Sequence, residues 1–301
     1  MRRERVTIER IAQEVGLSKF SVSRALAGKG GVGAAARARI ERAASELGYR
    51  PARQARQFAA TTELVPAVAG IILSVLWPEG LLQHAFRLGR PLVCGGYAEP
   101  LARVDQIVGD DWAGGVAVGR LLGRLGHRRI GFVRGAPGLP GRAERMRGLR
   151  DGTRDLAGAD LREIGFAEPG GFRDAFFATV KSGFAPSALF CAHDGMAVTA
   201  VSELLRLGIG VPDDISVVGF NDFASATQIV PQLTTVRMPQ EQAGEVMMRC
   251  LAMRLASSDL PPLKIMLMPE LIERASTASA REPQWLRRLN KLKTTVAEAR
   301  L

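Results

Sequence analysis

The side chains that could do acid–base or metal chemistry are few and scattered in this sequence. There are three histidines, His84, His127 and His193, and only His193 has an acidic neighbour, Asp194, without a third partner. A metal ion or a general acid–base pair needs such groups clustered. The sequence also has no Gly-x-Ser-x-Gly elbow, no GxxxxGK[ST] phosphate loop and no GxGxxG opening a helix. We therefore predict that the protein is not an enzyme and holds no cofactor or metal.

Basic side chains, in contrast, are concentrated at the two ends of the chain. Of the net charge of +11, residues 1–60 supply +8, with 13 Lys and Arg against 5 acidic residues, and residues 281–301 supply +4. The 220 residues between them carry a net charge of only −1. Basic side chains gain affinity for polyanions by displacing counterions from phosphates. The charge pattern therefore favours a nucleic-acid partner for the N-terminal segment, and a solvated basic surface without a partner is the alternative.

Length and composition describe an ordinary globular protein. The 301 residues suggest about two domains. A content of 47% hydrophobic and 24% charged residues excludes a disordered chain, a collagen-like fibre and a small disulfide scaffold. No signal sequence or membrane span is visible, because the longest mostly apolar stretch, residues 64–77, is short and contains Pro66. We expect a cytoplasmic protein whose cysteines are reduced core residues, namely Cys94, Cys191 and Cys250.

Three short helices are predicted within the first fifty residues. Thr7 is suited to cap a helix over residues 8–15, which Gly16 ends, and Ser18 is suited to cap a second helix over residues 19–27. A glycine-rich loop then leads to a third helix over residues 34–47. Two helices that are joined by a short turn containing Gly, and braced by a third, form a helix-turn-helix unit.

Beyond residue 65, short apolar runs alternate with helical patterns. The expected strands are residues 68–73, 91–95, 105–109, 129–133, 187–192 and 216–220. The expected helices are residues 81–88, 113–125, 142–158, 196–207 and 240–256. This alternation predicts an α/β fold with a parallel sheet, in which ligands bind at the carboxyl ends of the strands.

Several stretches are similar to one protein family, in the same order along the chain. Residues 6–26 (VTIERIAQEVGLSKFSVSRAL) resemble the N-terminal domain of the LacI/GalR (lactose-repressor) family of bacterial transcriptional regulators, and residues 46–51 (ELGYRP) resemble its junction into a hinge helix. Residues 125–130 (LGHRRI), 211–222 (VPDDISVVGFND) and 233–236 (LTTV) are similar to its effector-binding core. The resemblance implies an all-α helix-turn-helix DNA-binding domain followed by an α/β, periplasmic-binding-protein-like core with two Rossmann-like lobes.

The resemblance also implies an organisation and a function. The expected segments are a DNA-binding domain over 1–49, a hinge over 50–60, an effector-binding and dimerisation core over 61–280 and a basic tail over 281–301. About fifty residues of the first lobe are missing by comparison with the family. We expect a nucleoid-associated repressor that binds double-stranded, pseudo-palindromic operator DNA as a homodimer under control of a small polar effector. The first alternative is a DNA-binding architectural protein whose core binds no ligand. The second is a sugar-metabolising enzyme.

The second helix of a helix-turn-helix unit lies in the major groove, with its N-terminal residues against base edges. By resemblance, base readout belongs to Lys19, Phe20 and Arg24. Arg24 can bind guanine O6 and N7 through two hydrogen bonds, and Phe20 can contact a thymine methyl group, although a core position for Phe20 is the alternative. The expected phosphate contacts, through hydroxyls and helix N-terminal amides, are Thr7, Ser18, Ser21 and Ser23.

Residues 52–60 have high helix propensity but are too few to form a stable isolated helix. The resemblance implies a hinge helix that orders in the DNA-bound dimer. Phe58 matches the position of an apolar wedge in the minor groove, and Arg53 and Arg56 would then face phosphates. An ordinary flexible linker is the alternative.

The effector-binding positions that the resemblance implies lie in the expected α/β core. They are Asp110, Arg145, Phe166, His193 and Asn221. Such a set suits a small polar ligand such as a sugar or a sugar acid. The carboxylate and amide groups can hydrogen-bond hydroxyls, the guanidinium can donate hydrogen bonds, and the aromatic ring can stack on the ligand. His193 stands where relatives usually have Asn. Taken singly, each residue has an ordinary structural interpretation, such as a surface ion pair for Arg145.

The basic tail contains a short apolar repeat. Trp285, Leu289, Leu292 and Val296 follow one another at 4-3-4 spacing, which is the seam of a helix two heptads long. Such a helix would join two dimers into a tetramer. A frayed tail after Arg281 is the alternative.

Overall fold

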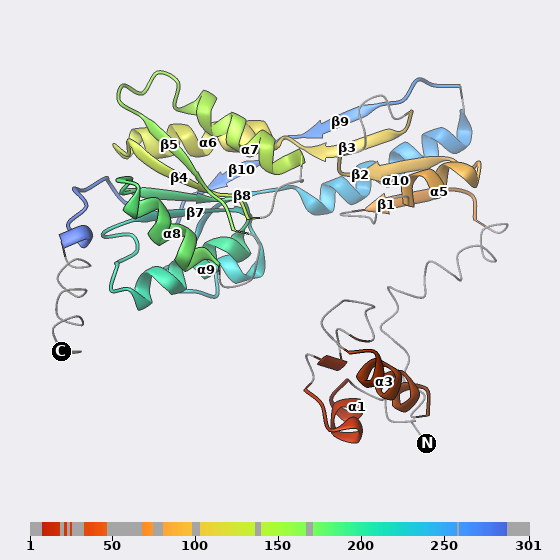
Figure 1. The fold of residues 1–301 in the computed structure, drawn as a ribbon. Helices are drawn as coiled ribbons and strands as arrows, with labels where there is room; N and C mark the ends of the chain where they lie inside the picture. The colour runs from red at the N-terminus through yellow and green to blue at the C-terminus, as the bar shows by residue number, and fades with distance from the viewer. Residues whose placement is uncertain are drawn as a thin grey trace. The chain divides into compact units, whose positions relative to one another are not determined.

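The computed structural model divides into two compact units, Met1–Ala69 and Gly70–Leu301, which are described separately (Figure 1). The residues that the structure describes are 8–18, 21, 22, 25, 33–46, 68–74, 81–97, 103–135, 140–166, 171–257 and 259–287. None of the helices among them has the length and apolar character needed to span a bilayer.

The N-terminal unit is built from helices around a small apolar core. Helix α1 spans Ile8–Val15 and helix α3 spans Ala34–Glu46, while Ser21, Val22 and Ala25 between them are helical. Gly16 ends α1 with a φ of +64°, a conformation that costs glycine little. The core side chains come from all three helical stretches and include Ile11, Val15, Val22, Ala25, Ile40 and Ala44. The predicted helix-turn-helix arrangement is confirmed for these residues.

Two arginines of α3 connect it to the ends of the other helical stretches. Arg39 donates a hydrogen bond of 2.7 Å to the carbonyl of Val15, the last residue of α1. Arg37 donates one of 2.9 Å to the carbonyl of Ala25. Carbonyls near helix C-termini have no partner inside the helix, and cationic donors stabilise them. These two arginines therefore have a structural role within the unit.

The larger lobe of the second unit contains a six-stranded sheet with the order β10-β8-β7-β6-β4-β5. Its strands are β4 (Arg129–Val133), β5 (Asp160–Ile164), β6 (Ala188–Cys191), β7 (Ser216–Asn221), β8 (Thr234–Arg237) and β10 (Glu270–Ile272). All neighbouring strands are parallel except β10 and β8. The carboxyl ends of β4 to β8 therefore lie along one edge, as the sequence predicts.

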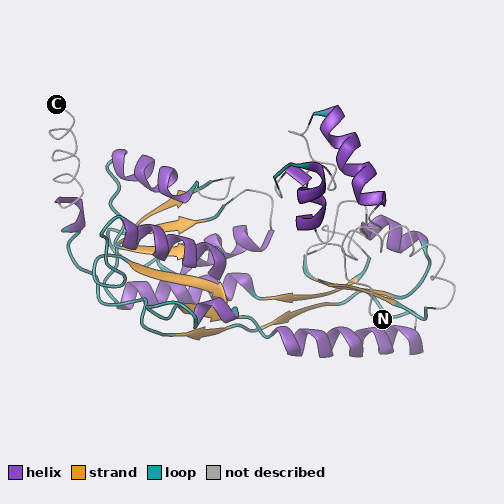
Figure 2. Ribbon diagram, turned by 90° about the horizontal axis from the view of Figure 1, so that it is seen from below, coloured by secondary structure: helices purple, strands orange, loops and turns teal. Residues whose placement is uncertain are grey.

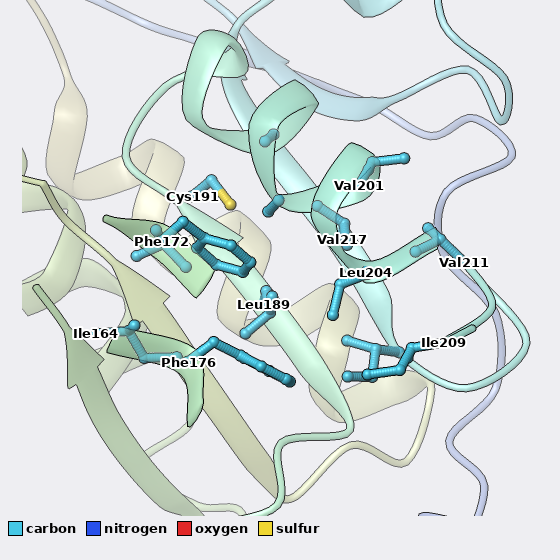
Figure 3. Close-up of a cluster of buried hydrophobic side chains, with 14 of the residues drawn as sticks. Ile164, Phe172, Phe176, Leu189, Cys191, Val201, Leu204, Ile209, Val211 and Val217 are labelled. Atoms are coloured by element: carbon cyan, nitrogen blue, oxygen red, sulfur yellow. The ribbon is translucent and has the colours of Figure 1, made fainter. Parts of the chain in front are cut away.

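Helices cover both faces of this sheet. Helices α6 (Asp111–Arg124) and α7 (Pro140–Gly152) lie on one face, and α8 (Phe172–Lys181) and α9 (Asp194–Arg206) lie on the other. Side chains alternate accordingly along β6, because successive residues of a strand point to opposite faces. Leu189 and Cys191 pack with α8 and α9 (Figure 3), whereas Phe190 packs with α6 and α7.

The smaller lobe contains a parallel four-stranded sheet with the order β1-β2-β3-β9 (Figure 1). Figure 2 shows the strands of this sheet in orange, with helices on both sides. Its strands are β1 (Ile71–Ser74), β2 (Leu92–Gly95), β3 (Asp105–Gly109) and β9 (Lys264–Leu267). Helix α5 (Leu81–Arg87) packs Leu82 and Ala85 on one face, and α10 (Gln240–Ala256) packs Met247 and Leu251 on the other. The chain passes from the smaller to the larger lobe between β3 and α6. It returns to the smaller lobe between β8 and α10, and it enters the larger lobe again between β9 and β10.

Most predicted elements are confirmed, and the differences are local. The strands at 105–109 and 129–133 and the helix at 240–256 have the predicted limits. The helix expected over 142–158 is wrong beyond Gly152, because turns follow α7, with Gly158 at a φ of +75°. The elements β5, α8, β8, β9 and β10 were not among the expected ones. Cys94, Cys191 and Cys250 are free and buried, which confirms the prediction for them.

The C-terminal segment differs from expectation at Trp285. This side chain is 0% exposed and lies in the core of the larger lobe, with its ring centroid 5.8 Å from that of Phe176. The prediction that Trp285 belongs to the seam of a separate helix, or to a frayed tail, is therefore wrong. An indole buries more apolar surface in this core than it would at the start of a two-heptad seam. Leu289, Leu292 and Val296 lie outside the described residues.

Candidate functional site

In the N-terminal unit, the structure describes two of the predicted DNA-contacting residues. Ser18 is exposed, and its Oγ accepts a hydrogen bond of 3.1 Å from the backbone N–H of Ser21. This contact confirms Ser18 as the N-cap of the second helix. Val22 and Ala25 are buried, so they define the inner face of that helix. The predicted residues outside the described part are Thr7, Lys19, Phe20, Ser23, Arg24, Arg53, Arg56 and Phe58.

In the second unit, the predicted effector-binding residues follow the carboxyl ends of strands or lie on α7. Asp110 follows β3 and caps α6, accepting a hydrogen bond of 2.8 Å from the N–H of Ala113. His193 follows β6 and caps α9 through Nδ1, which accepts from the N–H of Met196 at 3.3 Å. Asn221 is the last residue of β7. Phe166 follows β5 and packs edge-on against Phe172 in the core.

Arg145 is the most firmly held member of this set. Its Nε donates to Oδ1 of Asp111 at 2.7 Å, and the two side chains are only 13% and 6% exposed. The guanidinium also donates to the carbonyl of Ala192, directly before His193, and lies 3.8 Å from the ring centroid of Phe220, directly before Asn221. The interpretation of Arg145 as a surface ion pair is therefore wrong. Arg145 instead brings the ends of β6 and β7 together with α6.

Close backbone packing between α6 and α7 places Arg145 beside Asp111. A Cβ atom on Gly148 of α7 would lie 2.1 Å from the carbonyl oxygen of Trp112, and one on Gly115 of α6 would lie 2.2 Å from that of Arg145. Only glycine permits such an approach, because the opposing atoms belong to the backbone. The distance between the two helices, and with it the position of Arg145, is thus fixed by residues that carry no functional group.

Tyr97 joins the smaller lobe to this ion pair. It follows β2, and its hydroxyl hydrogen-bonds the carboxylate of Asp111 on α6. Burial and the nearby negative charge of Asp111 raise the pKa of Tyr97, so the phenol stays protonated and donates. The sequence motifs did not identify either residue, although Asp111 directly follows the predicted Asp110.

Backbone strain is concentrated where β7 ends. Asn221 and Asp222 have φ values of 103° and 54°, which are unfavourable for residues with a Cβ atom. The Asp222 carboxylate accepts from Arg237 at 2.8 Å and from Arg274 at 2.7 Å. Burial opposes ionisation of Asp222, but these hydrogen bonds outweigh it and hold its pKa below the ordinary value. Strain of this kind persists when the surrounding contacts hold it, and it clusters at functional sites.

His193 and Asp194, the adjacent pair in the sequence, do not act on each other. The buried Asp194 carboxylate accepts from Thr235 Oγ1 at 2.6 Å and from the N–H of Phe223 at 2.7 Å. Burial raises the pKa of Asp194. Burial, together with the charges of Arg142 and Arg145, lowers the pKa of His193. Asp194 therefore supports the turn after β7, and His193 is neutral near pH 7.

The arrangement at the strand ends suits hydrogen bonding to a polar ligand. Within the described ranges, no three His, Cys, Asp or Glu side chains are grouped as a metal site. Arg145 contacts the residues directly before His193 and Asn221 at the ends of adjacent strands, whereas Phe166 contributes to the core and Asp110 lies at the passage between the lobes. Such a set of fixed donors and acceptors can hold a polar ring by hydrogen bonds.

Comparisons with known proteins agree with both units. Residues 7–52 match the family model of bacterial regulatory proteins of the lacI family, and residues 120–277, more than half of the chain, match that of the periplasmic binding protein-like domain. The chain belongs to the LacI family. The predicted fold class, a helix-turn-helix unit followed by a periplasmic-binding-protein-like α/β core, is thereby confirmed.

Curated transcriptional repressors are among the relatives of this chain. It is 34% identical over 178 residues to the HTH-type transcriptional repressor PurR of Yersinia enterocolitica, and 33% identical over 178 residues to that of Yersinia pestis. Each match covers 58% of this chain and 52% of the relative. The chain thus aligns with about half the length of these curated relatives.

Solved structures of transcriptional regulators have the same fold. The transcriptional regulator CelR in complex with cellobiose is 26% identical, with a TM-score of 0.62, covering 90% of this chain and 100% of that one. The lac repressor dimer bound to operator is 19% identical, with a TM-score of 0.61 and coverage of 91% and 100%. A regulator from Enterococcus faecium with bound ribose is 22% identical, with a TM-score of 0.63 and coverage of 74% and 85%. The latter two are evidence of the fold alone.

Proposed function

We propose that this chain is a DNA-binding transcriptional repressor that binds a pseudo-palindromic operator as a dimer and responds to a small polar, sugar-like effector. The observation that carries the proposal is the combination of two units on one chain. A helix-turn-helix unit whose second helix is capped by Ser18 precedes a two-lobed unit in which Arg145 contacts the residues directly before His193 and Asn221. The names of the PurR relatives and the cellobiose complex of CelR support it.

The N-terminal unit supplies the chemistry for DNA. The net charge of +8 on residues 1–60 attracts phosphates, and the exposed Ser18 at the start of the second helix is suited to contact one. Lys19, Phe20 and Arg24 follow Ser18 and are proposed to read bases in the major groove. Arg53, Arg56 and Phe58 are proposed to contact the phosphates and the minor groove through the hinge. A repressor that makes these contacts would act in the cytoplasm, on nucleoid DNA.

The second unit supplies the effector site. Arg145 is fixed by Asp111, Ala192 and the Phe220 ring, so it can donate to a ligand hydroxyl without loss of side-chain freedom. Asn221 presents an amide from a strained turn, and His193 presents a neutral imidazole. Asp110 lies where β3 of the smaller lobe continues into α6 of the larger one. A ligand that contacts both lobes would therefore alter the angle between them.

Selection from random duplex DNA tests the first half of the proposal. The full chain should enrich a pseudo-palindromic sequence, and gel shifts on that sequence should show binding at least about 1,000-fold tighter than on random DNA. Enrichment of no sequence would contradict a regulator. A panel of sugars then tests the second half by its effect on the operator complex. Tight operator binding that no member of the panel changes would instead favour an architectural DNA-binding protein.

A further inference from the structure

Strand β1 differs from the other edge strands of the two described sheets. The edge strands are β1 and β9 in the smaller lobe and β5 and β10 in the larger lobe (Figure 1). Strands β9 (KIML), β5 (DLREI) and β10 (ELI) each carry at least one charged side chain, whereas β1 (IILS) carries none. Folded proteins use charged side chains on edge strands to prevent pairing with another chain. Among these described edges, β1 therefore lacks the usual protection.

The backbone of β1 presents hydrogen-bonding groups on its outer side. The N–H of Ile71 donates to the carbonyl of Pro91 at 2.8 Å, so Ile71 directs its backbone groups toward β2. Successive residues of a strand direct these groups to opposite sides. Ile72 and Ser74 therefore direct theirs away from β2, which is the one strand paired with β1 in the described sheet. This side of β1 can accept a further strand.

The side chains around this edge are apolar and partly exposed. Ile72 packs on the α10 face of the sheet, and a Cβ atom on Gly70 would lie 2.6 Å from Cδ1 of Leu251 on α10. Met248 and Leu255 stand three residues before and four residues after Leu251, so they share its side of the helix, toward the β1 edge. They are 58% and 50% exposed. An uncharged, apolar side of α10 thus accompanies the open edge.

We infer that β1 pairs in antiparallel orientation with β1 of a second copy of this chain, and that this pairing joins two smaller lobes into a dimer. The inference rests on the proposed function, because a pseudo-palindromic operator is bound by two copies related by a two-fold axis. A strand that pairs with itself in antiparallel orientation has this symmetry. Because β1 carries no charge, the two identical edges meet without like-charge repulsion.

One register satisfies both the backbone and the side chains. With the two-fold axis at Ile72, the two Ile72 residues exchange both of their backbone hydrogen bonds. Ser74 then lies opposite Gly70 of the second copy, and Ile71 lies opposite Leu73, so that apolar side chains meet across the axis. The two Ile72 side chains lie on the face of the sheet that α10 covers. The two smaller sheets become one continuous sheet without an open β1 edge.

Cysteine cross-linking of the full chain tests this register. Ile72→Cys places two Cα atoms about 5.5 Å apart, which suits a disulfide, so oxidation should convert most of the chain into a covalent dimer. Ser74→Cys is the matched control, because the two Cα atoms would be about 14 Å apart, too far for a disulfide. The native cysteines are free and buried, and the wild type measures their contribution.

Sedimentation of the reduced full chain measures the association itself. Met248→Glu should weaken the dimer by about 10-fold or more, because the new carboxylate would be desolvated beside its own copy. Met268→Glu is the control, because Met268 follows β9 at the other edge of the sheet and is 70% exposed. It should leave the dimer affinity within about 2-fold. The melting temperature of each variant establishes that it is folded.

Three results would overturn the inference. They are a wild-type chain that sediments as a monomer when it binds its operator, equal effects of Met248→Glu and Met268→Glu on the dimer, and equal cross-linking of Ile72→Cys and Ser74→Cys. Failure of the proposed function looks different, because it abolishes selective DNA binding and leaves the dimer. If the chain selects an operator as a dimer that neither Met248→Glu nor Ile72→Cys affects, the repressor stands and the β1 interface does not.

Discussion

Replacing Arg254 with Ala tests whether one buried ion pair holds the smaller lobe together. Asp105 begins β3 and is 1% exposed, and its carboxylate accepts from Nε and Nη2 of Arg254 at 2.6 and 2.7 Å. The N–H of Leu263 donates to the same carboxylate at 2.8 Å. Burial opposes ionisation of Asp105, but these bonds outweigh it and hold its pKa below the ordinary value. Arg254 also donates to the carbonyls of Leu260 and Pro261, so it connects α10, β3 and the segment before β9.

The expected loss is large because Asp105 would keep its charge without its partner. Removing one member of a buried ion pair typically lowers the free energy of unfolding by about 3–5 kcal/mol. For a unit of this size, that corresponds to a fall in Tm of about 6–20 °C. Arg249→Ala is the control on the same helix, because its pair with Glu245 spans 3.8 Å and the side chains are 81% and 69% exposed. It should change the free energy of unfolding by less than about 1 kcal/mol.

Thermal and urea unfolding of the full chain, followed by circular dichroism, measures both variants. The double variant Asp105→Asn, Arg254→Met should be more stable than Arg254→Ala, because no unpaired charge remains buried. If the Tm of Arg254→Ala equals that of Arg249→Ala within experimental error, the ion pair does not stabilise the lobe and the reasoning is wrong. If the double variant is less stable than Arg254→Ala, the loss comes from packing rather than from charge.

Three further predictions concern other parts of the chain. Arg24→Ala should weaken binding to the selected operator by about 1–3 kcal/mol and relax the preference at one base pair per half-site, and equal weakening on random DNA would indicate a phosphate contact instead. Burial lowers the pKa of His127 in the folded chain. The imidazole is therefore protonated at a higher pH in the unfolded chain than in the folded one, and the free energy of unfolding falls as the pH drops below 6.5. In urea unfolding at pH 7 and pH 5, His127→Gln should lose less stability over this interval than the wild type. Trp285→Ala should cost about 3–5 kcal/mol of stability, whereas deleting residues 288–301 should leave Tm unchanged, and the reverse order of effects would contradict a core role for Trp285.

The sequence predicts best those helices and strands whose own residues indicate both their limits and which side chains are buried. Strand β4 (RIGFV) is largely apolar, and β3 (DQIVG) has the apolar pair Ile107 and Val108 before Gly109. Both strands have a neighbouring strand on each side. The first helix ends at Gly16, whose positive φ is a local signal that the sequence already contains. The local sequence does not predict β5, an edge strand with the polar sequence DLREI, or β10, which has three residues and lies at the other edge of the described sheet. Their strand conformation comes from a neighbour distant in sequence.

The candidate site shows the same division. Arg145, His193 and Asn221 follow from the family resemblance, because each lies in or beside a recognisable motif. The acids that hold the site, Asp111 and Asp222, stand next to predicted residues, but their partners Arg145, Arg237 and Arg274 are far along the chain. No spacing rule connects such pairs. Their contacts exist only after strands and helices have packed, so the sequence indicates where a polar residue stands but not whether it is a ligand or a support.

Arg142 shows how helix packing selects among similar side chains. In the sequence it is one of several arginines on a strongly charged helix, and nothing distinguishes it from Arg147 or Arg150. The packing of Gly148 against Trp112 and of Gly115 against Arg145 determines which side of α7 faces α6. That choice points Arg142 and Arg145 toward the strand ends and leaves Arg147 and Arg150 exposed. The glycines at the contact between α6 and α7 therefore determine which arginines of α7 face the strand ends, although they carry no functional group themselves.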